Sequence, residues 1–110
     1  MTANRLDVLD ALIEELQARR KASPKKSYTA KLLSQGRHKV AKKLGEEGVE
    51  LALAIVDGDK AHVTAEAADV LYHFLVALMA RKVPVADVME ELERRFAMSG
   101  LEEKAARKAS

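Results

Sequence analysis

Two short groups of acidic residues have the types and the spacing of ligands for a divalent cation. Glu46, Glu47 and Glu50 lie in the segment GEEGVEL, and Glu66 and Asp69 lie in EAADVL. Residues three positions apart lie on one face of a helix, so each segment can present two carboxylates side by side. Ligands that are all oxygen atoms favour a hard cation. We therefore expect Glu47, Glu50, Glu66 and Asp69 to bind Mg²⁺, with Mn²⁺ as an alternative ion.

The position of Glu47 on its helix argues against a merely solvated acidic surface. With a turn of about 100° per residue, Glu47 falls within the apolar stripe of Val40, Leu44 and Leu51, and Glu46 lies further out. A carboxylate among core positions costs free energy unless it is paired or bound to a metal. A solvated helix face is the competing interpretation, and it does not explain why a second acidic pair matches the first.

The periodicity of apolar residues predicts helices throughout the chain and no β-strand. Apolar residues recur at helical spacing in the segments 4–20, 28–35, 37–56, 59–82 and 85–98. Residues suited to helix ends separate these segments: Ser27 and Asp59 as N-caps, Gly36 as a stop and Pro84 ahead of the last helix. We therefore expect an all-α fold, a bundle of four main helices plus one short helix.

An antiparallel pairing of the two longest helices would bring the acidic groups together. Segments 37–56 and 59–82 flank the residues DGD, so they can fold back on each other as a hairpin. Four converging carboxylates would repel one another strongly unless a cation neutralised them. A helical di-iron site needs a histidine three residues after a glutamate, and Leu53 follows Glu50 at that spacing. Iron is therefore not expected.

Composition and length indicate one domain with a small-molecule ligand. We expect the 110 residues to form a single domain over 1–98, followed by a frayed tail over 99–110 that is low in apolar residues. The absence of cysteine excludes disulfides and thiolate metal sites. No signal peptide and no apolar run near the roughly 20 residues of a membrane span is found, so we expect a cytoplasmic protein without a membrane partner. The net charge of +2 does not indicate nucleic-acid binding, but the basic segments RRKASPKK and RHKVAKK suit a phosphate-bearing ligand.

The segment 59–82 is apolar almost all round, which predicts self-association. Apart from the stripe of His62, Glu66, Asp69 and His73, its surface consists mainly of Val, Ala, Leu, Phe and Met. A helix of this kind belongs in the middle of a bundle or at a subunit interface. We therefore expect a homo-oligomer with a shared core, most simply a homodimer.

Longer motifs resemble a known family of enzymes. The segments SYTAKLLSQGRHKVAKKLGEEGVELALA and EAADVLYHFLVAL resemble phosphoribosyl-ATP pyrophosphatases, which belong to the all-α nucleoside-triphosphate pyrophosphatases. The pattern Glu-Glu-x-x-Glu followed by Glu-x-x-Asp indicates the superfamily, and SYTAKLL, the lysine cluster and DVLYH narrow it to this family. Gly48 stands where the resemblance leads us to expect alanine, which weakens the helix slightly and leaves the ligands in place.

The resemblance implies an activity and a set of roles. Such enzymes hydrolyse the bond between the α and β phosphates of phosphoribosyl-ATP and release phosphoribosyl-AMP and pyrophosphate, an early step of histidine biosynthesis. Glu46 lies off the main row of ligands, and we expect it to orient or deprotonate the attacking water. Residues expected to contact the phosphates or the nucleotide are Lys39, Lys42, Lys43, Ser27, Tyr28 and Thr29.

Several alternatives remain open at the level of sequence. A house-cleaning pyrophosphatase acting on dUTP or a damaged nucleotide would keep the acidic site, and a non-enzymatic helical interaction module would not need it. Lys39 and Lys43 could instead form ion pairs along their own helix. His73 could be a buried structural residue or a hydrogen-bond partner behind the site.

Overall fold

The computed structural model describes residues 3–96 and 100–109, and every regular element among them is a helix. The prediction of an all-α fold is therefore confirmed. In chain order the helices are α1 (Leu6–Arg19), α2 (Tyr28–Ser34), α3 (Arg37–Asp57), α4 (Lys60–Ala80), α5 (Val85–Phe96) and α6 (Gly100–Ala109).

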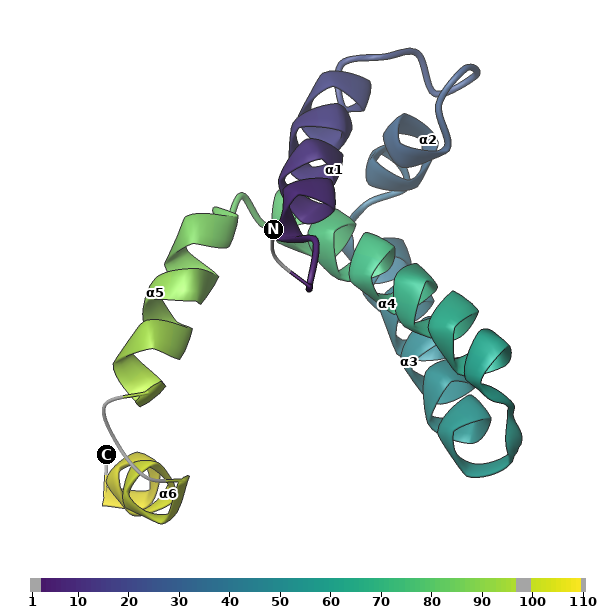
Figure 1. Ribbon diagram of the computed structural model, residues 1–110. Helices are drawn as coiled ribbons and strands as arrows, with labels where there is room; N and C mark the ends of the chain where they lie inside the picture. Colours follow the sequence, from purple (N-terminus) through teal and green to yellow (C-terminus); the bar gives the residue numbers. More distant parts are fainter. Residues whose placement is uncertain (1–2, 97–99, 110) are drawn as a thin grey trace.

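A long antiparallel hairpin of α3 and α4 is the main structural unit (Figure 1). Its tight turn consists of Gly58 and Asp59, and the Asp59 side chain accepts a hydrogen bond of 2.8 Å from the backbone N–H of His62, as an N-cap should. A Cβ atom on Gly58 would lie 2.8 Å from the carbonyl oxygen of Ala54 and 2.7 Å from Nδ1 of His62. Only glycine therefore fits this turn without displacing its neighbours.

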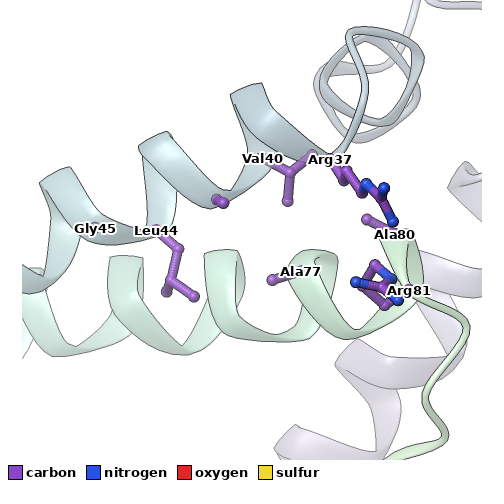
Figure 2. A pocket seen from close by; sticks show the side chains of 8 residues that line it. Arg37, Val40, Leu44, Gly45, Ala77, Ala80 and Arg81 are labelled. Atoms are coloured by element: carbon purple, nitrogen blue, oxygen red, sulfur yellow. The ribbon is translucent and has the colours of Figure 1, made fainter.

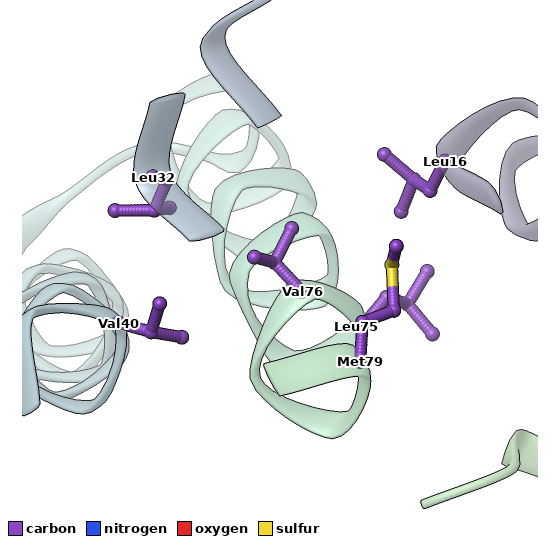
Figure 3. Close-up of a cluster of buried hydrophobic side chains, with 6 residues drawn as sticks. All are labelled: Leu16, Leu32, Val40, Leu75, Val76 and Met79. Atoms are coloured by element: carbon purple, nitrogen blue, oxygen red, sulfur yellow. The ribbon is translucent and has the colours of Figure 1, made fainter. Parts of the chain in front are cut away.

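Helices α1 and α2 pack at the end of the hairpin opposite this turn (Figure 1). The Ser27 side chain accepts a hydrogen bond of 3.1 Å from the N–H of Ala30, so it caps α2 as predicted. Gly36, with φ of 90°, separates α2 from α3. The core lies where these four helices meet, as Figure 3 shows, and it consists of Leu16, Leu32, Val40, Leu75, Val76 and Met79.

Helix α4, with 21 residues, is long and apolar enough to cross a membrane by length and composition alone. Three of its apolar side chains, Leu75, Val76 and Met79, are instead buried in the core. Its sequence is also interrupted by Glu66 and Asp69, whose carboxylates face α3. These are the properties of a central helix in a bundle.

The C-terminal part of the chain differs from the predicted bundle. Of the apolar residues of α5, only Val85 packs against the core, and Met89, Leu92 and Phe96 are exposed. Residues 100–109, which were expected to fray, form the sixth helix, α6. Low apolar content was a poor guide here because alanine, lysine, arginine and glutamate all have high helix propensity. The predicted boundary at residue 98 lies outside the described residues.

An apolar hollow of about 360 Å³ lies along the seam of α3 and α4 (Figure 2). Small and aliphatic side chains such as Val40, Leu44 and Ala77 form its floor, and Arg37 and Arg81 lie at one end. None of the residues predicted to carry chemistry lines it.

Candidate active site

Three of the predicted carboxylates meet between the two helices of the hairpin. One oxygen each from Glu47 on α3 and from Glu66 and Asp69 on α4 lie within 4.8 Å of one another. Glu47 and Glu66 are partly buried, and Asp69 is exposed. The antiparallel pairing that the sequence predicted is therefore the arrangement that gathers these groups.

Glu46 and Glu50 do not belong to this cluster of three carboxylates. Both are exposed on α3. The oxygens of Glu50 are not within the cluster, although Glu50 follows Glu47 at the same three-residue spacing that joins Glu66 to Asp69. The structure thus gathers three of the four predicted ligands and leaves Glu50 at the edge of the site.

Two nitrogen atoms accompany the carboxylate cluster. Nζ of Lys43 lies 3.5 Å from Oε1 of Glu47, and Nε2 of His62 lies 3.6 Å from Oε1 of Glu66. The pKa of Lys43 is raised above its usual value, first by Tyr28 and then by the hydrogen bond and charge of Glu47, so this lysine stays protonated. One lysine and one imidazole carry at most two positive charges, so they cannot balance three carboxylates, and the cluster retains excess negative charge.

The donor set fits a magnesium ion. All three ligand atoms are carboxylate oxygens, which Mg²⁺ prefers to nitrogen or sulfur. Oxygens bound at about 2.1 Å lie at most about 4.2 Å apart across the ion. The observed separations, up to 4.8 Å, exceed this by an amount that small side-chain rotations would remove. Water and substrate oxygens would complete the coordination, as is usual for Mg²⁺.

A groove of about 380 Å³ between α2 and α3 begins beside the carboxylate cluster. It is rich in lysines, and we refer to it as the lysine groove. Its lining residues are Tyr28, Lys31, Leu32, Gln35, Lys39, Lys42, Lys43 and Glu46.

Five of the eight residues that line the lysine groove were singled out from the sequence, and three were not: Lys31, Leu32 and Gln35. The polar residues Lys31 and Gln35 were not predicted, because the lysine cluster on α3 was the more obvious cationic feature. Lys31 and the C-cap residue Gln35 follow Tyr28 by three and seven positions, so they lie on the same side of α2 as Tyr28, which is the signal that could have revealed them.

Ser27 and Thr29 have structural partners in this arrangement. The Ser27 hydroxyl caps α2, and the Thr29 side chain is 1% exposed and hydrogen-bonded to the Tyr72 hydroxyl. Neither residue lines the lysine groove. Of the three consecutive residues predicted to meet the nucleotide, only Tyr28 lies where a ligand in the groove could contact it.

His73 connects the carboxylate helix to the lysine groove. Its Nδ1 lies 2.7 Å from the backbone carbonyl oxygen of Asp69. A carbonyl oxygen can only accept, so Nδ1 is protonated and donates this hydrogen bond. In the neutral ring Nε2 is then an acceptor, and the Tyr28 hydroxyl lies 3.4 Å from it. The ring is 6% exposed and packs edge-on against Tyr72, with centroids 5.0 Å apart. His73 is therefore a buried residue that contacts both the backbone of Asp69 and the side chain of Tyr28.

An all-helical fold that places a carboxylate cluster beside a cationic groove suits a phosphate-bearing ligand held through a divalent cation. Residues 9–96 match the model of the family described as phosphoribosyl-ATP pyrophosphohydrolase. The chain belongs to this family.

Curated relatives agree with the family match over the full length of the chain. A phosphoribosyl-ATP pyrophosphatase of Rhizobium johnstonii is 51% identical over 110 residues, which is 100% of both chains. One of Methylobacterium nodulans is 54% identical over 108 residues, or 98% of each chain. One of Cereibacter sphaeroides is 53% identical over 102 residues, covering 93% of this chain and 99% of the relative.

Proposed function

We propose that this protein hydrolyses phosphoribosyl-ATP between its α and β phosphates to give phosphoribosyl-AMP and pyrophosphate, in histidine biosynthesis. The family match supports the substrate. The single structural observation that carries the reaction is the ion pair of Lys43 with Glu47, because it joins the lysine groove to the carboxylate cluster.

Glu47, Glu66 and Asp69 would hold Mg²⁺, and Glu50 can approach from the edge of the site. When bound, the ion neutralises phosphate charge and polarises the phosphorus under attack. Lys43 and Lys42 then hold non-bridging oxygens as point charges. Lys43 suits this task because it lines the groove and lies beside the carboxylate cluster, 3.5 Å from Glu47.

Glu46 is our candidate for activating water. It lines the groove and is exposed, so its carboxylate can accept a proton from a water molecule beside the phosphates. The water oxygen bonds to phosphorus while the bridging bond to the neighbouring phosphate breaks. The proton passes to Glu46, and the pyrophosphate leaves through the open groove.

We further propose that the working form is a homodimer in the cytoplasm. Helix α3 exposes Val49, Leu53, Ile55 and Val56, each by at least 60%. On α5, Met89, Leu92 and Phe96 are also exposed. Large apolar side chains exposed to this extent are rarely left in contact with water by a soluble monomer, and a second copy would cover them.

The proposal is tested by measuring pyrophosphate release from phosphoribosyl-ATP, ATP and dUTP, each with and without Mg²⁺. We expect metal-dependent turnover of phosphoribosyl-ATP. Glu47→Gln should lower kcat/KM on the order of 100-fold or more, because it weakens the cation site that stabilises the transition state. Glu14→Gln, an exposed isosteric change on α1, is the matched control and should leave the rate unchanged.

Other outcomes would redirect the proposal. Turnover of dUTP in place of phosphoribosyl-ATP would keep the carboxylate site and indicate a house-cleaning enzyme. Failure to hydrolyse any of the three nucleotides, by a protein whose circular dichroism shows a folded helical state, would refute the enzymatic function.

A further inference from the structure

We propose that the end of the lysine groove furthest from the carboxylates, formed by Lys31, Gln35 and Lys39, binds the 5′-phosphate of the phosphoribosyl group. This inference rests on the proposed function, since it assigns one part of that substrate to one part of the groove. It makes these three residues determinants of specificity, because the phosphoribosyl group is what distinguishes phosphoribosyl-ATP from ATP.

The lysine groove has two distinct ends. At one end Tyr28 on α2 is close enough to Lys43 on α3 to raise the pKa of that lysine. At the other end Gln35 leads through Gly36 directly into α3, so Gln35 lies beside the first turn of that helix. Helix α2 therefore runs back along the start of α3, with Tyr28 at the carboxylate end and Gln35 at the far end.

The distance along the groove suits a ligand with charge at both ends. From Lys39 to Glu46 the α3 helix advances seven residues, or about 10 Å at 1.5 Å per residue. Phosphoribosyl-ATP carries its triphosphate on one ribose and a second 5′-phosphate on another ribose, with adenine between them. The reacting phosphates must lie beside Glu47 and Lys43, and the substrate can then extend along the groove with its second phosphate towards Lys39.

The charge of the groove supports a second anionic group. Four lysines line it against one carboxylate, Glu46. Lys43 is paired with Glu47, whereas no ion pair with a carboxylate is found in the described part of the chain for Lys31, Lys39 or Lys42. Unbalanced lysines sharing one concave surface create a positive potential that attracts anions.

The chemistry of the far end matches a phosphate monoester. Lys31 and Lys39 supply two ammonium groups, and the Gln35 amide supplies N–H donors for the phosphate oxygens. A phosphate carrying close to two negative charges would be nearly balanced by the two lysines.

The test compares two inhibitors that differ only in the phosphoribosyl group, phosphoribosyl-AMP and AMP. Their inhibition constants would be measured against phosphoribosyl-ATP hydrolysis for the wild type, Lys31→Gln and Lys39→Gln. We expect each substitution to weaken phosphoribosyl-AMP about tenfold, and AMP by less than about twofold, since only the former loses a charge-assisted contact. The KM for phosphoribosyl-ATP should rise with kcat largely retained.

The matched control is Lys60→Gln, which removes a lysine at the opposite end of the α3–α4 hairpin (Figure 1). It should change neither inhibition constant. Equal weakening of AMP and phosphoribosyl-AMP by Lys31→Gln and Lys39→Gln would overturn the proposal, because these lysines would then hold the phosphates common to both. Unchanged binding of phosphoribosyl-AMP would overturn it as well.

The design separates this inference from the proposed function. If the wild type did not release pyrophosphate from phosphoribosyl-ATP, the function would fail before any variant was compared. Calorimetric titration of phosphoribosyl-AMP and AMP into the metal-free protein gives the same comparison without turnover. All of the lysines concerned are exposed, so their substitution leaves the core intact.

Discussion

Replacing Asp69 by asparagine should stabilise the protein in the absence of metal, although it removes a proposed ligand. Asp69 lies within 4.8 Å of two other carboxylates, Glu47 and Glu66, measured between ligand oxygens. The unfolded chain separates these charges, so their repulsion acts only on the folded state. Asparagine keeps the shape of the side chain and leaves the backbone carbonyl that accepts the His73 hydrogen bond.

The magnitude follows from the distance and from the exposure of the site. At 4.8 Å and an effective dielectric of about 20, two unit charges repel by about 3.5 kcal/mol. Asp69 is exposed and Lys43 offsets part of the charge, so we expect a net gain of about 1 kcal/mol in the free energy of unfolding. For a chain of this length that corresponds to a rise of about 4 °C in Tm.

In the presence of magnesium, the wild type should become more stable than Asp69→Asn. At a free concentration of about 100 times Kd, a ligand that binds only the folded state raises the free energy of unfolding by about 2.7 kcal/mol. For this chain that corresponds to a rise of about 10 °C in Tm. The wild type should show this shift, and Asp69→Asn should show less than about half of it, because one of three charged ligands is lost. Asp10→Asn on α1 is the matched control and should follow the wild type in both conditions.

Thermal unfolding followed by circular dichroism, in chelator and then in a series of Mg²⁺ concentrations, measures both effects at one fixed protein concentration. The reasoning is refuted if Asp69→Asn is less stable than the wild type in chelator. It is equally refuted if the variant keeps the full magnesium shift, because the carboxylate cluster would then not be the cation site.

Two further predictions concern a buried hydrogen bond and a surface ion pair. Tyr72→Phe should lower the free energy of unfolding by about 1–3 kcal/mol, because it leaves the buried Thr29 hydroxyl without its partner. The double variant with Thr29→Val should recover most of that loss in denaturant titrations, and additive losses would contradict the pairing. On α5, hydrogen bonds from Arg94 and Arg95 lower the pKa of Glu91 to about 2. The lowered pKa of Glu91 stabilises the folded helix fully at pH values above the ordinary pKa near 4.5, and this stabilisation is lost as the pH falls towards 2. We therefore expect the helix content measured by circular dichroism to change less between these two pH values in Glu91→Gln than in the wild type.

The helix boundaries were predictable because the signals that set them are local. Ser27 and Asp59 cap the helices that follow them through hydrogen bonds to N–H groups three residues away. Gly36 and Gly58 lie at the turns that join α2 to α3 and α3 to α4. Each of these contacts spans only a few residues, so it can be read from the order of the amino acids.

Contacts between distant segments were not predictable in the same way. The hydrogen bond of Thr29 with Tyr72 joins residues 43 positions apart, and that of Tyr28 with His73 joins residues 45 positions apart. These contacts turn Thr29 inward and leave Tyr28 in the groove. Their adjacent positions in the sequence gave no indication of such different roles.

The sequence by itself determined the helical character of the chain, the hairpin and the chemistry of the acidic residues. Apolar periodicity, caps and turn glycines act over one or two turns of helix, and carboxylates keep the same preference for hard cations in any fold. The tertiary structure alone decided which side chains share one space. It brought Glu47 together with Glu66 and Asp69, placed Lys31 and Gln35 opposite the α3 lysines, and left α5 away from the core. The reason is that the packing angle and offset of helices depend on the whole set of contacting side chains.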